Sequence, residues 1–156
     1  MKVVVRKAVV EDFDELDRLY FELNPNRVSS RDVMADAVNS PGHHFVVVEE
    51  CSDEAGGQRS IVGTMCMTEI LLPSRGREAY INDLIITAHA RRNGYAMLLF
   101  DEIEREAKRR GCTRAKFTSV SKRKAAHAVF FKRGYVIRAS AVGETDTNLF
   151  ELKLDT

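Results

Sequence analysis

The sequence predicts an α/β (α+β) fold, in which about four helices flank a mixed sheet of about seven strands. Short segments rich in β-branched residues, such as KVVVRKAVV near the start of the chain, indicate strands. Other segments repeat apolar residues at the spacing of a helix that packs one face on a core. Clusters of Gly, Pro and Asn separate these segments and indicate turns. The resulting order is β-α-α-β-β-β-α-β-α-β-β.

Length and composition predict one domain, residues 1–156, with a core of its own. Charged residues make up 30% of the chain and the formal net charge is +1, so no overall field favours nucleic acid or a membrane surface. The apolar run in MKVVVRKAVVEDF is too short for a signal peptide, and no run approaches the roughly 20 residues of a membrane span. We therefore expect a cytoplasmic protein whose partners include neither nucleic acid nor membrane.

The cysteines give no metal-binding pattern. Cys51, Cys66 and Cys112 are scattered and odd in number. We expect buried, reduced thiols without a disulfide, and we expect no metal site.

The first half of the chain alternates strands, helices and turns. A strand is predicted at 1–10, and acids open a helix at 12–23 that Asn24-Pro25-Asn26 ends. Ser29 or Ser30 can cap a second, short helix. The apolar faces of the two helices hold Phe13, Leu16, Leu19, Tyr20 and Leu23, and then Val33, Met34, Ala37 and Val38.

Strands dominate the rest of the chain. The segment 79–87, AYINDLIIT, ends in a nearly continuous apolar run, as a buried central strand does. Gly134 is expected to end a short helix at 124–131. The other predicted strands are 44–49, 61–72, 114–120, 135–141 and 148–154.

The segment ARRNGYAMLLFDEIEREAKRRG, residues 90–111, predicts a long amphipathic helix with an unusual start. Gly94 stands where the helix begins, although glycine is a poor helix former. The first N–H groups of a helix lack internal partners and attract anions. Arg91, Arg92 and a residue without a side chain would suit a phosphate there, although a flexible turn with two solvated arginines fits the pattern as well. The Walker and Gly-x-Gly-x-x-Gly phosphate loops are absent.

Two segments resemble the signatures of the GNAT superfamily of acetyl-CoA-dependent N-acetyltransferases. INDLIIT, AHA and RRNGYA resemble a strand followed by Arg/Gln-x-x-Gly-x-Gly/Ala, and SKRKAAHAVFFKRGY resembles the second signature. The order of elements also matches over nearly the whole chain. The resemblance implies a mostly antiparallel twisted sheet with a central, splayed pair of parallel strands. It also implies that a homodimer can form through the last strands, while the oligomeric state stays open.

The resemblance assigns the cofactor-binding residues. The backbone of the loop would hold the pyrophosphate of coenzyme A, and the preceding strand would pair with the pantetheine arm. Arg123 falls where many members carry an asparagine that touches the same arm, and Phe130 falls beside the thioester. The implied cofactor-binding residues are Leu84, Ile85, Ile86, Arg91, Arg92, Asn93, Gly94, Tyr95, Ala96, Arg123 and Phe130.

The catalytic residues implied are Asp83 and Leu84. The backbone N–H of Leu84 would stabilise the developing oxyanion. Asn82 stands where an acid is common, so Asp83 is the candidate general base, although alternation along a strand would point it away from Asn82. A structural, hydrogen-bonded Asp83 is the open alternative, and Glu69 and Glu78 are reserve candidates.

The usual general acid is missing. The tyrosine of the second signature is replaced by Phe130, which cannot donate a proton. His127 lies one turn away and could serve, yet a lone histidine is more often structural. Tyr135 is expected in the core.

The acceptor is expected to be a small-molecule or peptide amine. Its binding residues are expected in 23–31 and 73–77, because loops carry specificity. Arg27, Arg31, Arg75 and Arg77 would suit an anionic acceptor, while solvation explains them equally well. One alternative function is a non-catalytic acyl-CoA-binding regulatory module. Another is a nucleic-acid binder that uses 108–110 and 122–124, but no aromatic residues lie between these basic ones.

Overall fold

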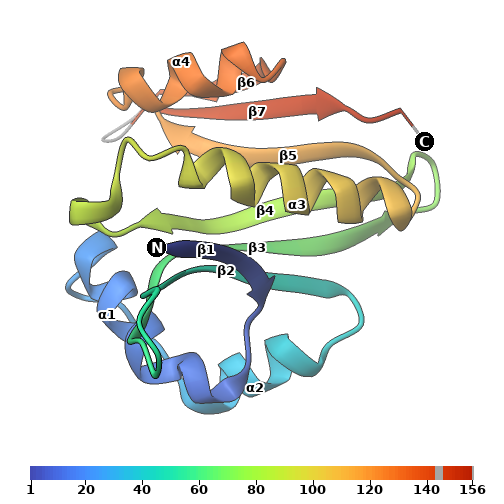
Figure 1. The fold of residues 1–156 in the computed structure, drawn as a ribbon. Coiled ribbons are helices and arrows are strands. Elements are labelled where there is room, and N and C mark those ends of the chain that lie inside the picture. Colours follow the sequence, from blue (N-terminus) through green and yellow to red (C-terminus); the bar gives the residue numbers. More distant parts are fainter. Residues whose placement is uncertain (143–145, 156) are drawn as a thin grey trace. The chain divides into compact units, whose positions relative to one another are not determined.

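The computed structural model describes residues 1–142 and 146–155. In this part of the chain, seven strands form one sheet in the order β1-β2-β3-β4-β5-β7-β6 (Figure 1). The strands are β1 (Lys2–Lys7), β2 (His43–Cys51), β3 (Arg59–Leu72), β4 (Gly76–Ile86), β5 (Cys112–Val120), β6 (Val136–Ala141) and β7 (Thr147–Lys153). The helices are η1 (Val10–Asp12), α1 (Phe13–Leu23), α2 (Arg31–Asn39), η2 (Ala88–Ala90), α3 (Tyr95–Arg109) and α4 (Lys124–Lys132).

The predicted fold class is confirmed. Strands β4 and β5 run parallel, whereas β1 with β2, β2 with β3, β5 with β7 and β6 with β7 run antiparallel. The parallel register extends from Arg77↔Cys112 to Tyr80↔Lys116, and β4 continues beyond it to Ile86. The sheet is therefore mixed, with a parallel pair among antiparallel strands.

The predicted elements are all present, with shifted ends. The strand predicted at 1–10 ends at Lys7, because Val10–Asp12 form a 3-10 turn. The Asp12 carboxylate accepts the N–H of Val9 at 2.9 Å and so holds that turn. Ser30 caps α2, as its Oγ accepts the N–H of Val33 at 3.4 Å.

The chain divides into two compact units, and each is described by itself. The first comprises Met1–Thr68 and Asn82–Glu106, and the second comprises Glu69–Ile81 and Ala107–Thr156. The expectation of a single domain over residues 1–156 stays a prediction. Within the described residues, no helix combines the length and the apolar character that a membrane crossing requires.

Helices cover both faces of the sheet in the first unit. Phe45 and Val47 on β2 belong to a core built with apolar residues of α1 and α2, two helices that lie along the same side in Figure 1. His44 points the other way, and its Nε2 lies 3.0 Å from Oε1 of Glu102 on α3. Because successive residues of a strand face opposite sides, α3 lies across the sheet from α1 and α2.

The second unit has an aromatic core on one face and charged residues on strands β4, β5 and β7. Phe117 on β5 packs edge-on to Phe130 of α4 at 4.7 Å between ring centroids, and stacks on Phe150 of β7 at 5.2 Å. Lys116, the neighbour of Phe117, points to the opposite face, where its Nζ lies 3.0 Å from Glu78 Oε1. The aromatic face of this sheet holds α4 in place.

Candidate functional site

The end of β4 leads into the loop that the sequence predicts as a phosphate site. Leu84, Ile85 and Ile86 are the last residues of β4, and η2 and then the loop 91–94 connect them to α3. Ala90 is buried, whereas the residues 91–94 are exposed. The nine predicted cofactor residues from Leu84 to Ala96 therefore follow one another along a strand end, an exposed loop and a helix N-terminus in the first unit.

Two side chains of the loop hold its shape. Nε of Arg91 donates to the backbone oxygen of Ile86 at 3.0 Å. Nδ2 of Asn93 donates to the backbone oxygen of Ala90 at 2.9 Å. These bonds hold the loop against the strand end and η2, and the first N–H groups of the helix that follows have no partners within the helix.

Gly94 has a backbone conformation that suits glycine. Its φ is 76°, in the left-handed region, and a Cβ built there would meet open space. Any other residue would therefore be strained at this position and would project its side chain into the space in front of α3. Arg92 also has a positive φ, 66°, which marks this loop as tightly turned.

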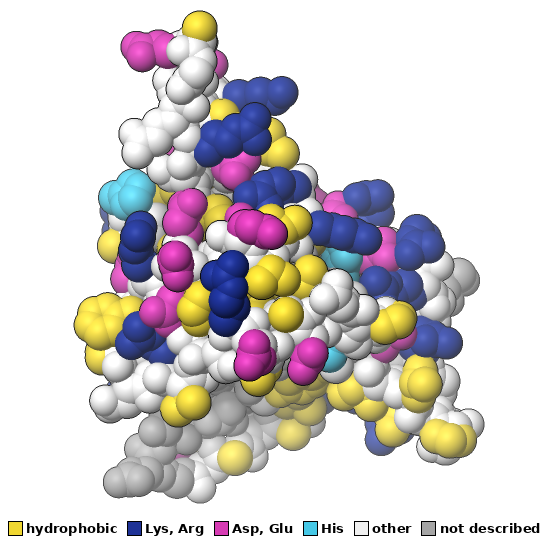
Figure 2. Space-filling view, turned by 90° about the horizontal axis from the view of Figure 1, so that it is seen from below, with side chains coloured by type: hydrophobic (Ala, Val, Ile, Leu, Met, Phe, Trp, Pro, Cys, Tyr) yellow, Lys and Arg dark blue, Asp and Glu magenta, His cyan; other side chains and the backbone are white. Residues whose placement is uncertain are grey.

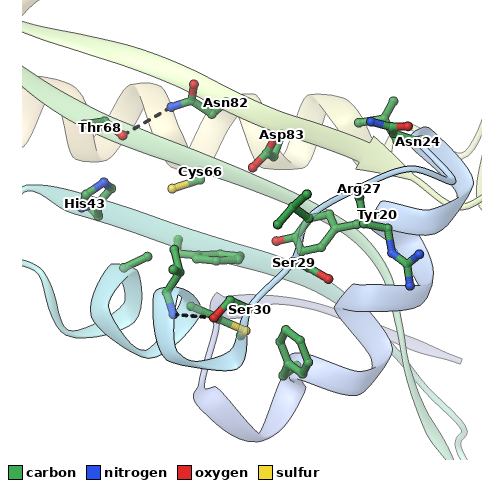
Figure 3. Close-up of a pocket in the computed structure, with 17 residues that line it drawn as sticks. Tyr20, Asn24, Arg27, Ser29, Ser30, His43, Cys66, Thr68, Asn82 and Asp83 are labelled. Atoms are coloured by element: carbon green, nitrogen blue, oxygen red, sulfur yellow. Dashed lines mark hydrogen bonds between the residues drawn. The ribbon is translucent and has the colours of Figure 1, made fainter.

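A pocket of about 490 Å³ lies in the first unit, between α1, α2 and strands β2, β3 and β4 (Figure 3). Figure 3 shows polar side chains from three strands, His43, Cys66, Thr68, Asn82 and Asp83, across from Tyr20, Asn24, Arg27, Ser29 and Ser30 of the helical side. The remaining lining residues are mostly apolar: Phe13, Leu23, Val28, Val33, Met34, Ala37 and Phe45. Part of the segment 23–31, which the sequence predicts to bind the acceptor, thus lines a pocket.

Asn82 and Asp83 both line this pocket, so the expectation that they point to opposite faces is wrong. The φ of Asp83 is 53°, which interrupts the extended backbone of β4. Alternation holds only for a regular strand, and an irregular residue in a strand allows two successive side chains to face the same side. Nδ2 of Asn82 donates to Oγ1 of Thr68 at 3.3 Å. Among the residues that line the pocket, Asp83 supplies the carboxylate.

The pocket environment changes the acidity of three side chains. Removal of water by the surrounding protein raises the pKa of the Asp83 carboxyl, although the side chain stays accessible from the pocket. Burial, and then the charge of Asp83, raise the pKa of the Cys66 thiol to about 12. Burial also raises the pKa of the Tyr20 hydroxyl, with smaller contributions from Asp83 and Cys66. At neutral pH, Cys66 and Tyr20 therefore stay protonated.

The reserve bases are held in ion pairs of the second unit. Glu69 lies 2.9 Å from Nη1 of Arg77 and 3.2 Å from Nη1 of Arg110. Glu78 is 2% exposed and lies 3.0 Å from Lys116. These contacts support a structural role for both carboxylates.

The residues of the second signature also lie in the second unit. Arg123 occupies the N-cap position of α4, and Phe130 is buried in the aromatic core. His127 is buried as well, and its Nε2 lies 3.2 Å from Oγ of Ser119. Tyr135 is in the core as predicted, 5.0 Å from Phe117 between ring centroids. The roles of Arg123 and Phe130 at a cofactor stay predictions.

Sequence reasoning missed the residues that connect α1 with the end of β4. Oε1 of Glu22 accepts a hydrogen bond from Thr87 Oγ1 at 2.5 Å, and Oε2 accepts the N–H of Ala88 at 3.2 Å. Tyr20, Cys66 and Thr68 of the pocket were also not predicted. No local pattern marks such residues, because they are brought together from separate elements.

The cysteines are free thiols, with Cys66 and Cys112 buried and Cys51 half-buried. In the part of the chain that the structure describes, no group of three or more His, Cys, Asp or Glu side chains could hold a metal ion.

The chain matches the model of the acetyltransferase (GNAT) family over residues 10–135, and it belongs to this family. No curated protein sequence matches the chain.

Solved structures share its fold. NAA60 of Arabidopsis thaliana in complex with a bisubstrate analogue has a TM-score of 0.83 and 16% identity, and covers 99% of this chain and 100% of its own. YncA of Salmonella typhimurium, with its cofactor acetyl-CoA, has a TM-score of 0.79 and 15% identity over 100% of this chain and 96% of its own. PaiA N-acetyltransferase of Thermoplasma acidophilum, in complex with coenzyme A, has a TM-score of 0.74 and 14% identity. The match covers 98% of this chain and 99% of the PaiA chain. At these identities the likeness shows a common fold.

Proposed function

We propose that this protein transfers the acetyl group of acetyl-CoA to a primary amine of a small molecule or a peptide. One observation carries the proposal. Asp83 lines a pocket, and the same strand continues through Leu84–Ile86 into an exposed loop and a helix N-terminus. One stretch of chain therefore carries first a carboxylate that can bind an amine, at Asp83, and then a helix N-terminus that can bind a phosphate, at the start of α3.

The residues of this stretch fit coenzyme A. The loop 91–94 is exposed, and the space in front of Gly94 is open, so phosphate oxygens can approach the N–H groups of α3. The backbone of Arg91–Ala96 would hold the pyrophosphate, and the backbone of Leu84–Ile86 would hold the pantetheine arm. Acetyl-CoA would supply the acetyl group as a thioester. The bound acetyl-CoA or coenzyme A of family members with this fold supports the assignment.

Asp83 would act on the amine. Amines are mostly protonated at neutral pH, so the ionised carboxylate first attracts the ammonium group and then accepts its proton. The neutral amine nitrogen attacks the thioester carbonyl carbon, the carbon–sulfur bond breaks, and the thiolate takes up a proton. The N–H of Leu84 would donate to the carbonyl oxygen as negative charge develops on it. A Cys66 thiol with a pKa of about 12 is a weak nucleophile, which favours direct attack over a covalent acyl-enzyme.

No residue is assigned as the general acid that protonates the departing thiolate. Phe130 cannot supply it, and His127 is buried against Ser119. Thiolate departure from an activated thioester can proceed into solvent unaided. Together, Phe130 and Asn82 favour the second candidate function, a non-catalytic acyl-CoA-binding regulatory module.

Two observations on charge weigh against the nucleic-acid alternative. On the face shown in Figure 2, acidic side chains lie among the basic ones and no continuous basic surface forms. Arg110, in one of the two basic segments, is paired with Glu69. A cytoplasmic location and a homodimer remain part of the proposal, and a sedimentation measurement would test the dimer.

The experiment is acetyl transfer from acetyl-CoA to a panel of primary amines, measured as free thiol released and as a mass increase of the amine. Calorimetric titration with coenzyme A measures cofactor binding separately. We expect both binding and turnover, and we expect Asp83→Asn to lose turnover while it keeps cofactor affinity. Binding without turnover on any amine would favour the regulatory module, and the absence of binding would refute both functions.

A further inference from the structure

The charged residues of the pocket are unequally neutralised. Arg27 and Asp83 both line it. Arg27 is held by Asp17 through two contacts, Nε to Oδ1 at 3.1 Å and Nη2 to Oδ2 at 2.8 Å. Such a two-point pair is strong and fixes the orientation of the guanidinium. Figure 3 shows the Arg27 guanidinium pointing away from Asp83.

Other contacts strengthen the hold on Arg27. The Ser29 hydroxyl donates to the same Asp17 carboxylate, and the bonds from Arg27 and Ser29 lower the pKa of Asp17. The Arg27 guanidinium also lies 4.9 Å from the centroid of the Phe21 ring. The positive charge of Arg27 is therefore already used within the protein.

The negative charge of Asp83 is not used in this way. Within the residues that the structure describes, Asp83 forms no ion pair and no hydrogen bond, and its raised pKa comes from desolvation. Its neighbours Tyr20 and Cys66 are protonated at neutral pH and cannot compensate it. The pocket thus offers the carboxylate of Asp83 to a cationic group, whereas its arginine is already paired with Asp17.

The helical side of the pocket exposes apolar side chains. Leu23, Val28 and Val33 line it and are 54%, 99% and 66% exposed. Single exposed apolar residues are ordinary, but several around one pocket mark a site for an apolar ligand. Phe13 and Met34 continue this surface inward.

We infer that the acceptor is a primary amine that carries an apolar substituent and has no anionic group beside the amine. This inference rests on the proposed function and names its substrate class. The ammonium group would bind at Asp83, and the substituent would lie against Leu23, Val28 and Val33. An anionic acceptor, which four arginines of the sequence suggested, is disfavoured because Asp17 neutralises Arg27 and Glu69 pairs with Arg77. Arg31 and Arg75 do not line the pocket.

The test compares acceptors that differ in one group. Phenylalaninamide and phenylalanine differ in the carboxylate, and phenylalaninamide and glycinamide differ in the apolar side chain. We expect kcat/KM for phenylalaninamide to exceed each of the other two at least tenfold. Calorimetric titration of the same three compounds, with coenzyme A present, should give the same order of affinity. A comparison of kcat/KM for phenethylamine and for a tetrapeptide that begins with Phe then shows whether the acceptor is a small amine or the N-terminus of a peptide.

Two variants test the residues themselves. Asp17→Asn keeps an acceptor for Ser29 and frees the charge of Arg27, so it should raise kcat/KM for phenylalanine severalfold relative to phenylalaninamide. Val33→Ser changes an exposed residue and should lower kcat/KM for phenylalaninamide severalfold, with little change for glycinamide. Circular dichroism of both variants checks that they are folded.

Equal or better use of phenylalanine or 2-aminoethylphosphonate by the parent protein would overturn the inference while the proposed function stands. A lack of turnover with every amine would instead refute the proposed function, and the inference with it.

Discussion

Glu22, the penultimate residue of α1, accepts a hydrogen bond at 2.5 Å from the hydroxyl of Thr87, the residue after β4. The same carboxylate accepts the N–H of Ala88 at 3.2 Å. The helix that carries part of the pocket wall is thereby attached to the start of the loop before α3. This contact connects the proposed acceptor and cofactor sites within the first unit.

Replacing Glu22 by alanine should weaken binding of coenzyme A severalfold. The substitution leaves the buried Thr87 hydroxyl and the Ala88 N–H without their acceptor, which costs about 1–3 kcal/mol of stability. Calorimetric titration and thermal unfolding measure the two effects. Glu11→Ala removes an exposed glutamate before α1 and serves as the control. Unchanged affinity in Glu22→Ala would show that the contact does not support the loop.

Gly94→Glu should abolish binding of coenzyme A, because its carboxylate would compete with phosphate for the N–H groups of α3. Gly94→Ala is the matched variant, since both place a side chain at a φ of 76°. This backbone conformation costs about 1–2 kcal/mol for either residue. The two variants should therefore lose similar stability, while the glutamate variant loses far more affinity. Equal affinities would place the pyrophosphate elsewhere.

Asp83→Asn should lower turnover by about 10²-fold to 10⁴-fold, the usual contribution of a general base. In the parent protein, turnover should rise with pH on an acidic limb whose midpoint lies above about 3.9, the ordinary pKa of aspartate. Desolvation raises the pKa of Asp83, which moves the limb in that direction. A pH–rate profile of both proteins measures this. A limb that persists in the variant would belong to another group.

Asp83→Asn should also stabilise the protein at neutral pH. Because the pKa of Asp83 is raised on folding, its ionisation opposes folding. This cost is absent below the pKa of the unfolded chain, grows as the pH rises, and is complete above the pKa of the folded protein. The gain in melting temperature should therefore vanish as the pH falls through about 4. Asp36→Asn, at an exposed position of α2, is the matched control for the substitution itself.

Phe130→Tyr should destabilise the protein by about 1–3 kcal/mol, because it places an unpaired hydroxyl in a buried aromatic core. Phe130 is 5% exposed and packs edge-on to Phe117 and Phe150. Denaturant unfolding measures the loss, and Phe131→Tyr, at a site 49% exposed on the same helix, should be nearly neutral. If thiolate departure limits turnover, the added phenol should raise it. A large fall in turnover with folding intact would mean that the Phe130 ring itself shapes the site.

Local patterns in the sequence determined the elements and the loop. The helical spacing in 12–23, the Ser30 cap and the apolar end of 79–87 depend on neighbours within a few residues, so α1, α2 and β4 could be predicted from them. Gly94 and the arginines before it could be recognised for the same reason, since the geometry of a strand, a loop and a helix start is local. The family followed from this signature and the order of elements, and the family match confirms it.

Contacts between separate elements were decided by the tertiary structure. Asp83 faces the pocket because its φ of 53° breaks the alternation that a regular strand would impose, and INDLIIT contains no glycine to mark that break. The sequence offered Arg27 as a candidate for binding the acceptor. In the structure its charge is neutralised, because the turn after α1 brings it back to Asp17. Periodicity reports which face of an element is apolar, but it does not report which side chains of different elements meet. The charge of the pocket, and with it the expected acceptor, therefore depends on long-range packing.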